Sequence, residues 1–286
     1  MTANADWYFE SSTEWGTGFA LELSDKRKVH EEQTPYQLLA VYETKTFGYM
    51  MTLDNILMLT SRDNFVYHEM LAHPVLYSHP HPKRVCIIGG GDCGTLNEVL
   101  KHPEVESVIQ IDIDERVTRV SEQYFPELCV NNHDPRATLA FEDGIKWMQE
   151  APAGSLDVII VDSTDPIGPG AVLYSQEFFQ SCWRALGEQG LLAQQSESPL
   201  IHLEKLIVPL HKTMRSAGFA AIQLHHYPQV TYPSGWWSTT IASKQGVVPA
   251  ARSNPESLSQ STRYYSAALH NASAILPPFL QAALAS

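Results

Sequence analysis

The sequence predicts an α/β fold in which a mostly parallel sheet, covered by helices on both faces, follows a small N-terminal β domain. Three observations support this class. Short apolar runs separated by polar turns dominate the first part of the chain, as in hairpin strands. Further on, apolar strand patterns alternate with helical ones, as in βαβ units. The stretch IIGGGDCGTL at 87–96 then places a glycine-rich loop between a strand and a helix, as in nucleotide-binding folds.

The β domain is expected over residues 1–64, where the runs GFALEL, QLLAVYET and GYMMTLDNILMLT are separated by polar residues. A helix over 61–78 is expected to lead out of it, because apolar side chains recur there at helical spacing. The SHPHPKR segment that follows alternates histidine with proline, so we interpret it as a rigid connector rather than a metal site.

The second domain is expected over residues 65–286, and 286 residues suffice for one large domain with a smaller one. Short apolar runs followed by turn residues predict strands at 84–90, 107–114, 137–144, 156–163 and 190–196. Helical patterns lie between several of them, at 94–102, 116–125 and 174–186. Because these strands are continuously apolar, both faces of the sheet are expected to be buried.

Composition narrows the function. No stretch approaches ~18 consecutive apolar residues, and the N-terminus lacks the pattern of a signal peptide. The four cysteines form no C-x-x-C pair, so reduced thiols in a cytoplasmic protein are expected. The net charge of −13 argues against a nucleic-acid partner, because phosphate contacts need clustered Lys and Arg. It is compatible with a cationic substrate, although many cytoplasmic proteins are simply acidic.

The glycine-rich loop matches a dinucleotide-binding fingerprint. Gly89, Gly91 and Gly94 have the spacing G-x-G-x-x-G, and Asp112 ends the next strand about 20 residues later, placed to accept hydrogen bonds from a ribose. Such a loop normally surrounds an anion with backbone N–H groups. Here it contains Asp92, whose negative charge would repel a phosphate.

Carboxylates follow most of the predicted strands, and the carboxyl ends of parallel strands meet at one crevice. They are Asp92, Asp112, Asp143, Asp162, Asp165 and Glu197. Any one of them could instead cap a helix or turn. A metal site would also suit clustered carboxylates, but the nearby prolines and aromatic residues favour an organic cation. A dehydrogenase is disfavoured, because Asp92 would weaken pyrophosphate binding.

Several motifs together resemble the spermidine synthase (polyamine aminopropyltransferase) family over nearly the whole chain. The family's G-G-G-D-G-G loop is matched as GGGDCG, and its D-S/C-x-D-P-x-G-P segment as DSTDPIGP at 162–169. TYPSG at 231–235 and RYYSAALHNASAILP near the C-terminus match two later motifs. The resemblance implies a Rossmann-like, methyltransferase-type domain after a small β domain, and a homodimer or homotetramer. It also implies transfer of an aminopropyl group from decarboxylated S-adenosylmethionine to an amine.

The resemblance gives Asp92 a function. Decarboxylated S-adenosylmethionine keeps an ammonium group but lacks the α-carboxylate of S-adenosylmethionine. Asp92 would pair with the ammonium and repel the carboxylate, so one side chain would attract the right donor and exclude the abundant wrong one.

Matching positions imply the remaining roles. Asp162 would be catalytic, taking the proton from the attacking nitrogen. The donor would bind to Gln37, Gly89, Gly91, Asp92, Asp112, Asp143, Gly144 and Pro169. The amine would bind to Tyr67, His68, Asp92, Asp162, Asp165, Glu197 and Tyr232. Either Trp236 or Trp237 would add an aromatic wall. No metal and no cofactor beyond the donor co-substrate is implied.

The pattern departs from the family at three notable positions. Cys93 replaces a glycine, and we interpret its thiol as a packing group, with a reactive thiol as the alternative. Asp112 stands where glutamate is common, and Leu200 where an aromatic residue is common. Putrescine is the expected acceptor, with cadaverine, agmatine and spermidine as alternatives. Two other function classes remain. Asp92 disfavours a methyltransferase, and Asp162 disfavours an inactive, polyamine-binding relative.

Overall fold

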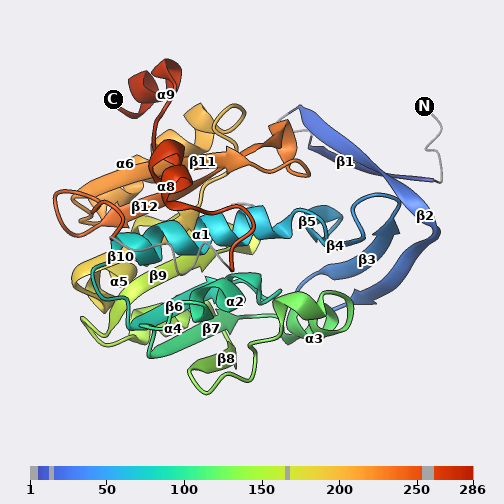
Figure 1. Ribbon diagram of the computed structural model, residues 1–286, viewed down its shortest axis with the longest axis horizontal. Helices are drawn as coiled ribbons and strands as arrows, with labels where there is room; N and C mark the ends of the chain where they lie inside the picture. The colour runs from blue at the N-terminus through green and yellow to red at the C-terminus, as the bar shows by residue number, and fades with distance from the viewer. Residues whose placement is uncertain (1–5, 13–15, 165–167, 253–260, 286) are drawn as a thin grey trace.

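The computed structural model describes residues 6–12, 16–164, 168–252 and 261–285. Within these ranges the strands form two sheets, which Figure 1 shows side by side, with helix α1 leading from one to the other. The first part of the chain builds the smaller sheet and the rest builds the larger one. The predicted fold class is confirmed: a mostly parallel α/β sheet preceded by a small β domain.

The N-terminal sheet is antiparallel, with its strands in chain order: β1(Trp7–Ser12), β2(Thr17–Gln33), β3(Leu38–Thr44), β4(Tyr49–Leu53) and β5(Ile56–Thr60). Strand β2 is longer than the predicted run GFALEL and has register shifts on either side of Lys28, where its side chains are exposed. Leu39 and Met51 of this sheet pack against Val117 and Phe125, in and just after helix α3. This apolar contact joins the two parts of the molecule.

The larger sheet has, in spatial order, strands β11(Ala221–Pro228), β12(Trp236–Ser243), β10(Leu186–Gln195), β9(Leu156–Asp162), β6(Arg84–Gly89), β7(Ser107–Asp112) and β8(Ala137–Phe141). From β10 to β8 all neighbours pair in parallel, whereas β12 is antiparallel to both β10 and β11. The strands predicted at 84–90, 107–114, 137–144, 156–163 and 190–196 are all present, and they form this parallel part.

Helices cover both faces of the larger sheet. The helices are α1(Asn64–Ser78), α2(Gly94–Leu100), α3(Glu115–Tyr124), α4(Gly144–Glu150), α5(Gln176–Ala185), α6(Val208–Ser216), α8(Ala267–Ser273) and α9(Pro278–Leu284). Short helical turns are η1(Pro126–Leu128), η2(Gly168–Tyr174), η3(Leu203–Ile207) and η4(Pro233–Gly235). Alternate residues of β6 and β9 enter different clusters: Ile87 and Ile160 pack with α1 and α2, and Ile88 and Ile159 pack with α4, α5 and α6. This burial on both faces explains the continuous apolar strands.

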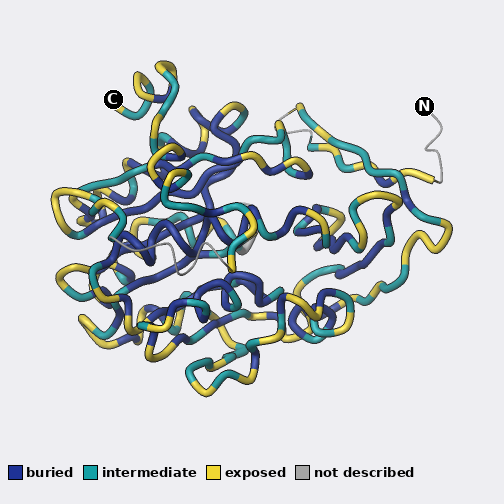
Figure 2. The backbone as a smooth tube through the Cα atoms, in the orientation of Figure 1, coloured by how far each residue is buried: buried dark blue, intermediate teal, exposed yellow. Residues whose placement is uncertain are grey.

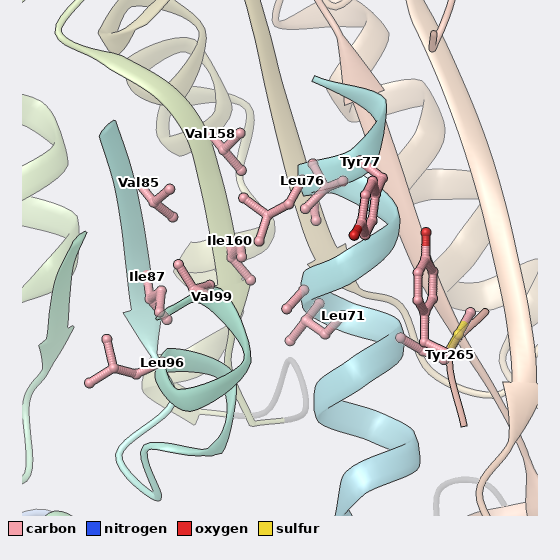
Figure 3. Close-up of a cluster of buried hydrophobic side chains, with 14 of the residues drawn as sticks. Leu71, Leu76, Tyr77, Val85, Ile87, Leu96, Val99, Val158, Ile160 and Tyr265 are labelled. Carbon is pink, nitrogen blue, oxygen red and sulfur yellow. The ribbon is translucent and has the colours of Figure 1, made fainter. Parts of the chain in front are cut away.

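Helix α1 is buried along nearly its whole length, as Figure 2 shows. In Figure 3 its Leu71 and Leu76 lie with Val158 and Ile160 of β9 in one apolar cluster. The buried carboxylate of Glu69 accepts hydrogen bonds from the backbone N–H groups of residues 263, 264 and 265, at 2.7–2.8 Å. The C-terminal segment is thereby held against α1, where Tyr265 stacks on Tyr77.

The chain reverses its direction of travel across the sheet at β6 and β9. From β6 it proceeds to β7 and β8 on one side, and then continues with β9 and β10 on the other. A crevice opens at the carboxyl ends of strands where such a reversal occurs. Gly89 of β6 is directly paired with Asp162 of β9. The glycine-rich loop and the DSTDP segment therefore begin at the same place.

Candidate active site

A pocket lies where the N-terminal sheet meets the carboxyl ends of the larger sheet. Residues from both sheets and from α1 line it, among them Glu10, Met58, Tyr67, Gln195, Tyr232 and Trp237. The three aromatic rings contact one another: Tyr232 lies 5.8 Å from Tyr67 and 4.6 Å from Trp237, centroid to centroid. The hydroxyl of Tyr232 donates to the backbone carbonyl of Met58, which fixes its ring across the boundary between the sheets.

Asp162, at the end of β9, lies directly behind Tyr67. The Tyr67 hydroxyl donates to its Oδ1 at 2.6 Å and the Thr95 hydroxyl donates to its Oδ2 at 2.6 Å. Burial raises the pKa of the Asp162 carboxyl, and the negative charge of Asp92 raises it further, while His68 and the two hydroxyl donors oppose the shift. The side chain is thus a proton acceptor held in one orientation, with a higher pKa than an exposed aspartate.

Asp92, in the glycine-rich loop, is paired with His68 of α1. The His68 Nε2 lies 3.1 Å from Asp92 Oδ2, and the N–H of Gly94 donates to Asp92 Oδ1 at 2.7 Å. Burial by itself would lower the pKa of His68, but the charge and hydrogen bond of Asp92 outweigh it and raise the pKa to about 9. His68 in turn lowers the pKa of Asp92 against the effect of burial. At neutral pH the pair is therefore a carboxylate and an imidazolium.

Two glycines of the loop are required by close contacts. A Cβ on Gly89, whose φ is +82°, would lie 2.1 Å from the backbone oxygen of Asp162. A Cβ on Gly94 would lie 2.2 Å from the His68 ring. Gly89 thus lets β6 leave the sheet beside Asp162, and Gly94 makes room for the imidazole that pairs with Asp92. The middle glycine of the fingerprint, Gly91, lies against the carboxylate of Asp112.

The predicted donor side is partly assembled around Asp112. Its Oδ1 accepts the N–H of Asp114 at 2.8 Å, and burial raises its pKa to about 6. Gln37, from the N-terminal sheet, donates to Oδ2 of Asp114 at 2.9 Å, next to the hydroxyl of Thr34 at 2.7 Å. Asp114 also accepts the N–H of Arg116 at the start of α3. The buried Asp114, which the sequence interpretation did not single out, thereby holds Gln37 against this end of the sheet.

Asp143 caps a helix, which was the alternative to a binding role for each of the six carboxylates. Its exposed carboxylate accepts the N–H groups of Ile145 and Lys146 at 2.8 and 3.2 Å, so it caps helix α4. Gly144 begins that helix close to Ile88, where a Cβ would come within 3.0 Å. The predicted roles of Asp143 and Gly144 in binding the donor stay predictions.

The amine side differs from its prediction in detail. Glu197 is buried, 3.3 Å from His202 and 3.1 Å from the amide of Gln195. Among the described residues, Gln195 lines the pocket and Glu197 does not.

The side chains of two further predicted residues cannot be placed. Asp165 lies outside the described residues, and so does the side chain of Pro169. Trp237, not Trp236, forms the aromatic wall, because the indole of Trp236 turns away to bond His226.

Besides Asp114, three further residues of the site were not predicted from the sequence. Thr95 lies three residues after Asp92, in the first turn of the helix predicted to follow the loop. That position alone predicts that its side chain lies close to the loop. Gln195 ends β10, a position that the strand-end rule covers. Glu10 lies on β1 and reaches the pocket only because the N-terminal sheet packs there, and no sequence pattern marks it.

The described ranges contain no group of three or more His, Cys, Asp or Glu side chains arranged to hold a metal ion. Among the helices in these ranges, none is long and apolar enough to cross a membrane.

The His68–Asp92 pair predicts a loss of stability as the pH rises. The native pKa of His68, about 9, exceeds the unfolded value near 6.5, so the native state binds the extra proton between these values. The pair contributes about 3 kcal/mol to the free energy of unfolding below pH ~6.5, and this contribution is lost as the pH rises through 9. Urea unfolding at pH 6.5 and at pH 9 should therefore show a smaller fall in the free energy of unfolding for His68→Gln than for the wild type. The exposed control His133→Gln should keep the full drop; equal drops in all three proteins would contradict the prediction.

The chain is similar to known proteins along nearly its whole length. Residues 64–252 match the spermine/spermidine synthase domain, and residues 6–61 match the spermidine synthase tetramerisation domain. Polyamine aminopropyltransferases of Thioalkalivibrio sulfidiphilus and Methylococcus capsulatus are each 54% identical to the chain. The first alignment covers 98% of both proteins, and the second covers 98% of this chain and 97% of the relative.

Solved structures agree as well. A spermidine synthase in complex with the transition state analogue AdoDATO superposes with a TM-score of 0.90, and the spermidine synthase of Thermotoga maritima with 0.89. Each is 35% identical to this chain, with 98% of this chain and 94% of the other covered. The methyltransferase alternative is not supported. The chain belongs to the spermine/spermidine synthase family, and it is an aminopropyltransferase of polyamine biosynthesis.

Proposed function

We propose that the protein transfers the aminopropyl group of decarboxylated S-adenosylmethionine to putrescine, giving spermidine and methylthioadenosine. The observation that carries this proposal is the pair of half-buried carboxylates at the carboxyl ends of two adjacent strands. Asp92 follows β6 beside the donor loop, and Asp162 ends β9 behind the aromatic pocket. One carboxylate can bind a cation on the donor while the other accepts a proton from the acceptor.

Asp92 selects the donor. Its carboxylate would exchange the imidazolium of His68 for the ammonium of the decarboxylated donor, a like-for-like replacement of one cation by another. S-adenosylmethionine would add a carboxylate beside Asp92 in a buried site, where like charges repel strongly. The proposed donor contacts at Gln37, Asp112, Asp143, Gly144 and Pro169 would hold the adenosyl group.

The reaction is a displacement at the methylene carbon next to the sulfonium. The nitrogen lone pair forms the new C–N bond, the electrons of the C–S bond pass to sulfur, and the sulfonium becomes a neutral thioether. Protonation of the leaving group is therefore unnecessary. The attacking amine has an ordinary pKa near 10.4 and must lose a proton, which Asp162 would take. Burial raises the pKa of Asp162 and so makes it a stronger base, while Tyr67 and Thr95 keep it oriented.

The pocket suits a diamine. Aromatic rings of Tyr67, Tyr232 and Trp237 would surround the chain, removing water from the reacting nitrogen and so favouring its neutral form. The carboxylate of Glu10 would hold the distal ammonium. Asp165 and Glu197 stay predicted contributors to that contact. A single acidic group lining the described part of the pocket matches one distal cation, as in putrescine.

We also propose a homo-oligomer, dimeric or tetrameric, joined through the N-terminal sheet, which matches the tetramerisation domain. A metal ion or a cofactor beyond the donor co-substrate has no role in the proposed reaction. All four cysteines are free thiols, which supports a cytoplasmic location.

Product analysis tests the reaction. The protein is mixed with decarboxylated S-adenosylmethionine and, in parallel, putrescine, cadaverine, agmatine or spermidine, and mass spectrometry identifies the products. We expect spermidine and methylthioadenosine in equal amounts, with putrescine giving the highest kcat/KM. A higher kcat/KM with another amine would replace putrescine as the acceptor, and no aminopropylated product at all would refute the proposal.

Replacing the proton acceptor should slow the chemistry. Asp162→Asn keeps the shape of the side chain but cannot accept the proton, so we expect kcat to fall by about 10²–10⁴. Donor affinity, measured by isothermal titration, should change far less. Glu150→Gln, at an exposed position on α4, serves as the matched control and should leave kcat unaltered. A wild-type rate in Asp162→Asn would rule out this assignment.

Replacing Asp92 should narrow donor discrimination. Asp92→Asn can still accept the Gly94 N–H but carries no charge, so affinity for decarboxylated S-adenosylmethionine should fall by about 30-fold or more. Affinity for S-adenosylmethionine should fall less or rise, because its carboxylate is no longer repelled. Isothermal titration of both compounds against wild type and variant gives the two ratios. An unchanged ratio would assign the discrimination to another residue.

A further inference from the structure

Two thiols from separate elements meet behind the donor loop. Cys93 lies between Asp92 and Gly94, and Cys129 directly follows η1. The Cys93 thiol donates to the carbonyl of Gly91 at 3.7 Å, and the Cys129 thiol donates to the carbonyl of Asp92 at 3.6 Å. These carbonyls belong to successive residues, so both thiols lie against the same turn. The two thiols also lie close enough for Cys93 to raise the pKa of the Cys129 thiol.

The backbone at Cys93 is unusual for a residue with a side chain. Its φ of 68° and ψ of 4° lie in the left-handed region, which costs a non-glycine residue roughly 1–2 kcal/mol. Glycine would adopt this conformation freely. A thiol therefore occupies a position whose backbone conformation favours glycine.

Access to the pair is through Cys129, which is half-buried, whereas Cys93 is fully buried. The other two cysteines offer an internal comparison. Cys86 and Cys182 also lie close enough to interact, but both are fully buried in the core on the opposite side of the sheet. An oxidant in solution can therefore reach the first pair and not the second.

We propose that Cys93 and Cys129 form a reversible oxidation site that inactivates the enzyme when a peroxide converts them to a disulfide. Peroxide oxidises the Cys129 thiol to a sulfenic acid and releases one water. The Cys93 sulfur then attacks the Cys129 sulfur, and a second water leaves with the thiol proton. In total the two thiols lose two electrons and two protons, and one hydrogen peroxide becomes two waters.

The disulfide would disturb both carboxylates. A disulfide bond is about 2.05 Å long, shorter than any non-bonded contact between two sulfur atoms, so its formation draws Cys93 towards Cys129. Asp92 is the preceding residue and would move with it. Thr95, two residues further on, holds Oδ2 of Asp162. One covalent change behind the loop would thus alter donor binding and the orientation of the proton acceptor together.

The oxidation is expected to be slow. The neighbouring Cys93 thiol and burial raise the pKa of the Cys129 thiol, and the charge of Asp92 adds to the effect. Little thiolate is present at neutral pH, and the thiolate is the reactive form. The pair should therefore respond to sustained exposure to peroxide rather than to brief pulses.

The test exposes the full-length reduced protein to hydrogen peroxide over a time course, blocks free thiols, and measures activity and disulfide-linked peptides on the same samples. We expect a linked peptide joining Cys93 to Cys129, an activity loss of at least tenfold that follows its appearance, and recovery of both by dithiothreitol. Cys129→Ser should keep its basal activity and resist peroxide. Cys182→Ala, which removes a thiol of the buried pair, should stay as sensitive as the wild type.

Three results would overturn the proposal: absence of the linked peptide in inactivated protein, full activity in protein that carries the link, or equal inactivation of Cys129→Ser. Cys129→Ala provides a second variant should the serine perturb the loop. The redox proposal rests on the proposed function only because its test measures loss of aminopropyltransferase activity. The linked peptide is measured independently of any substrate, so failure of the redox site and failure of the proposed reaction are distinguishable.

Discussion

The contact between the ends of β6 and β9 governs the site. Gly89 is paired with Asp162 so closely that a Cβ would lie 2.1 Å from the aspartate's backbone oxygen, and the Gly90 N–H bonds that oxygen at 2.8 Å. Because no side chain separates the strands there, the loop after β6 turns across the end of β9. That turn brings Asp92 to Asp162 and starts α2 where Thr95 meets the same carboxylate.

Two like charges so close in a buried site are costly unless partners compensate them. His68 supplies a positive charge to Asp92, and Tyr67 and Thr95 supply hydroxyl donors to Asp162. Both His68 and Tyr67 are adjacent residues of α1, the buried helix that joins the two sheets. The helix therefore links the packing of the core to the electrostatics of the site.

The parts of the site that depend on local residue spacing are predictable from the sequence. The strand-end rule located Asp92, Asp112 and Asp162, since parallel strands must end at one edge of their sheet. It gave no means of separating Asp143, which caps α4, from those three, because capping and ligand contact favour the same residue at the same position. It also named Glu197, whose buried side chain lies 3.3 Å from His202 and whose contact with the amine stays a prediction.

By itself the sequence determined the fold class, the glycine-rich loop and the family, because each depends on periodicity or on short motifs of neighbouring residues. Only the tertiary structure decided that Glu10 enters the pocket, that Trp237 and not Trp236 is its wall, and that Cys93 meets Cys129. These contacts join segments far apart in the chain. They depend on how the N-terminal sheet, η1 and β12 pack, and packing is set by the whole apolar core rather than by any local pattern.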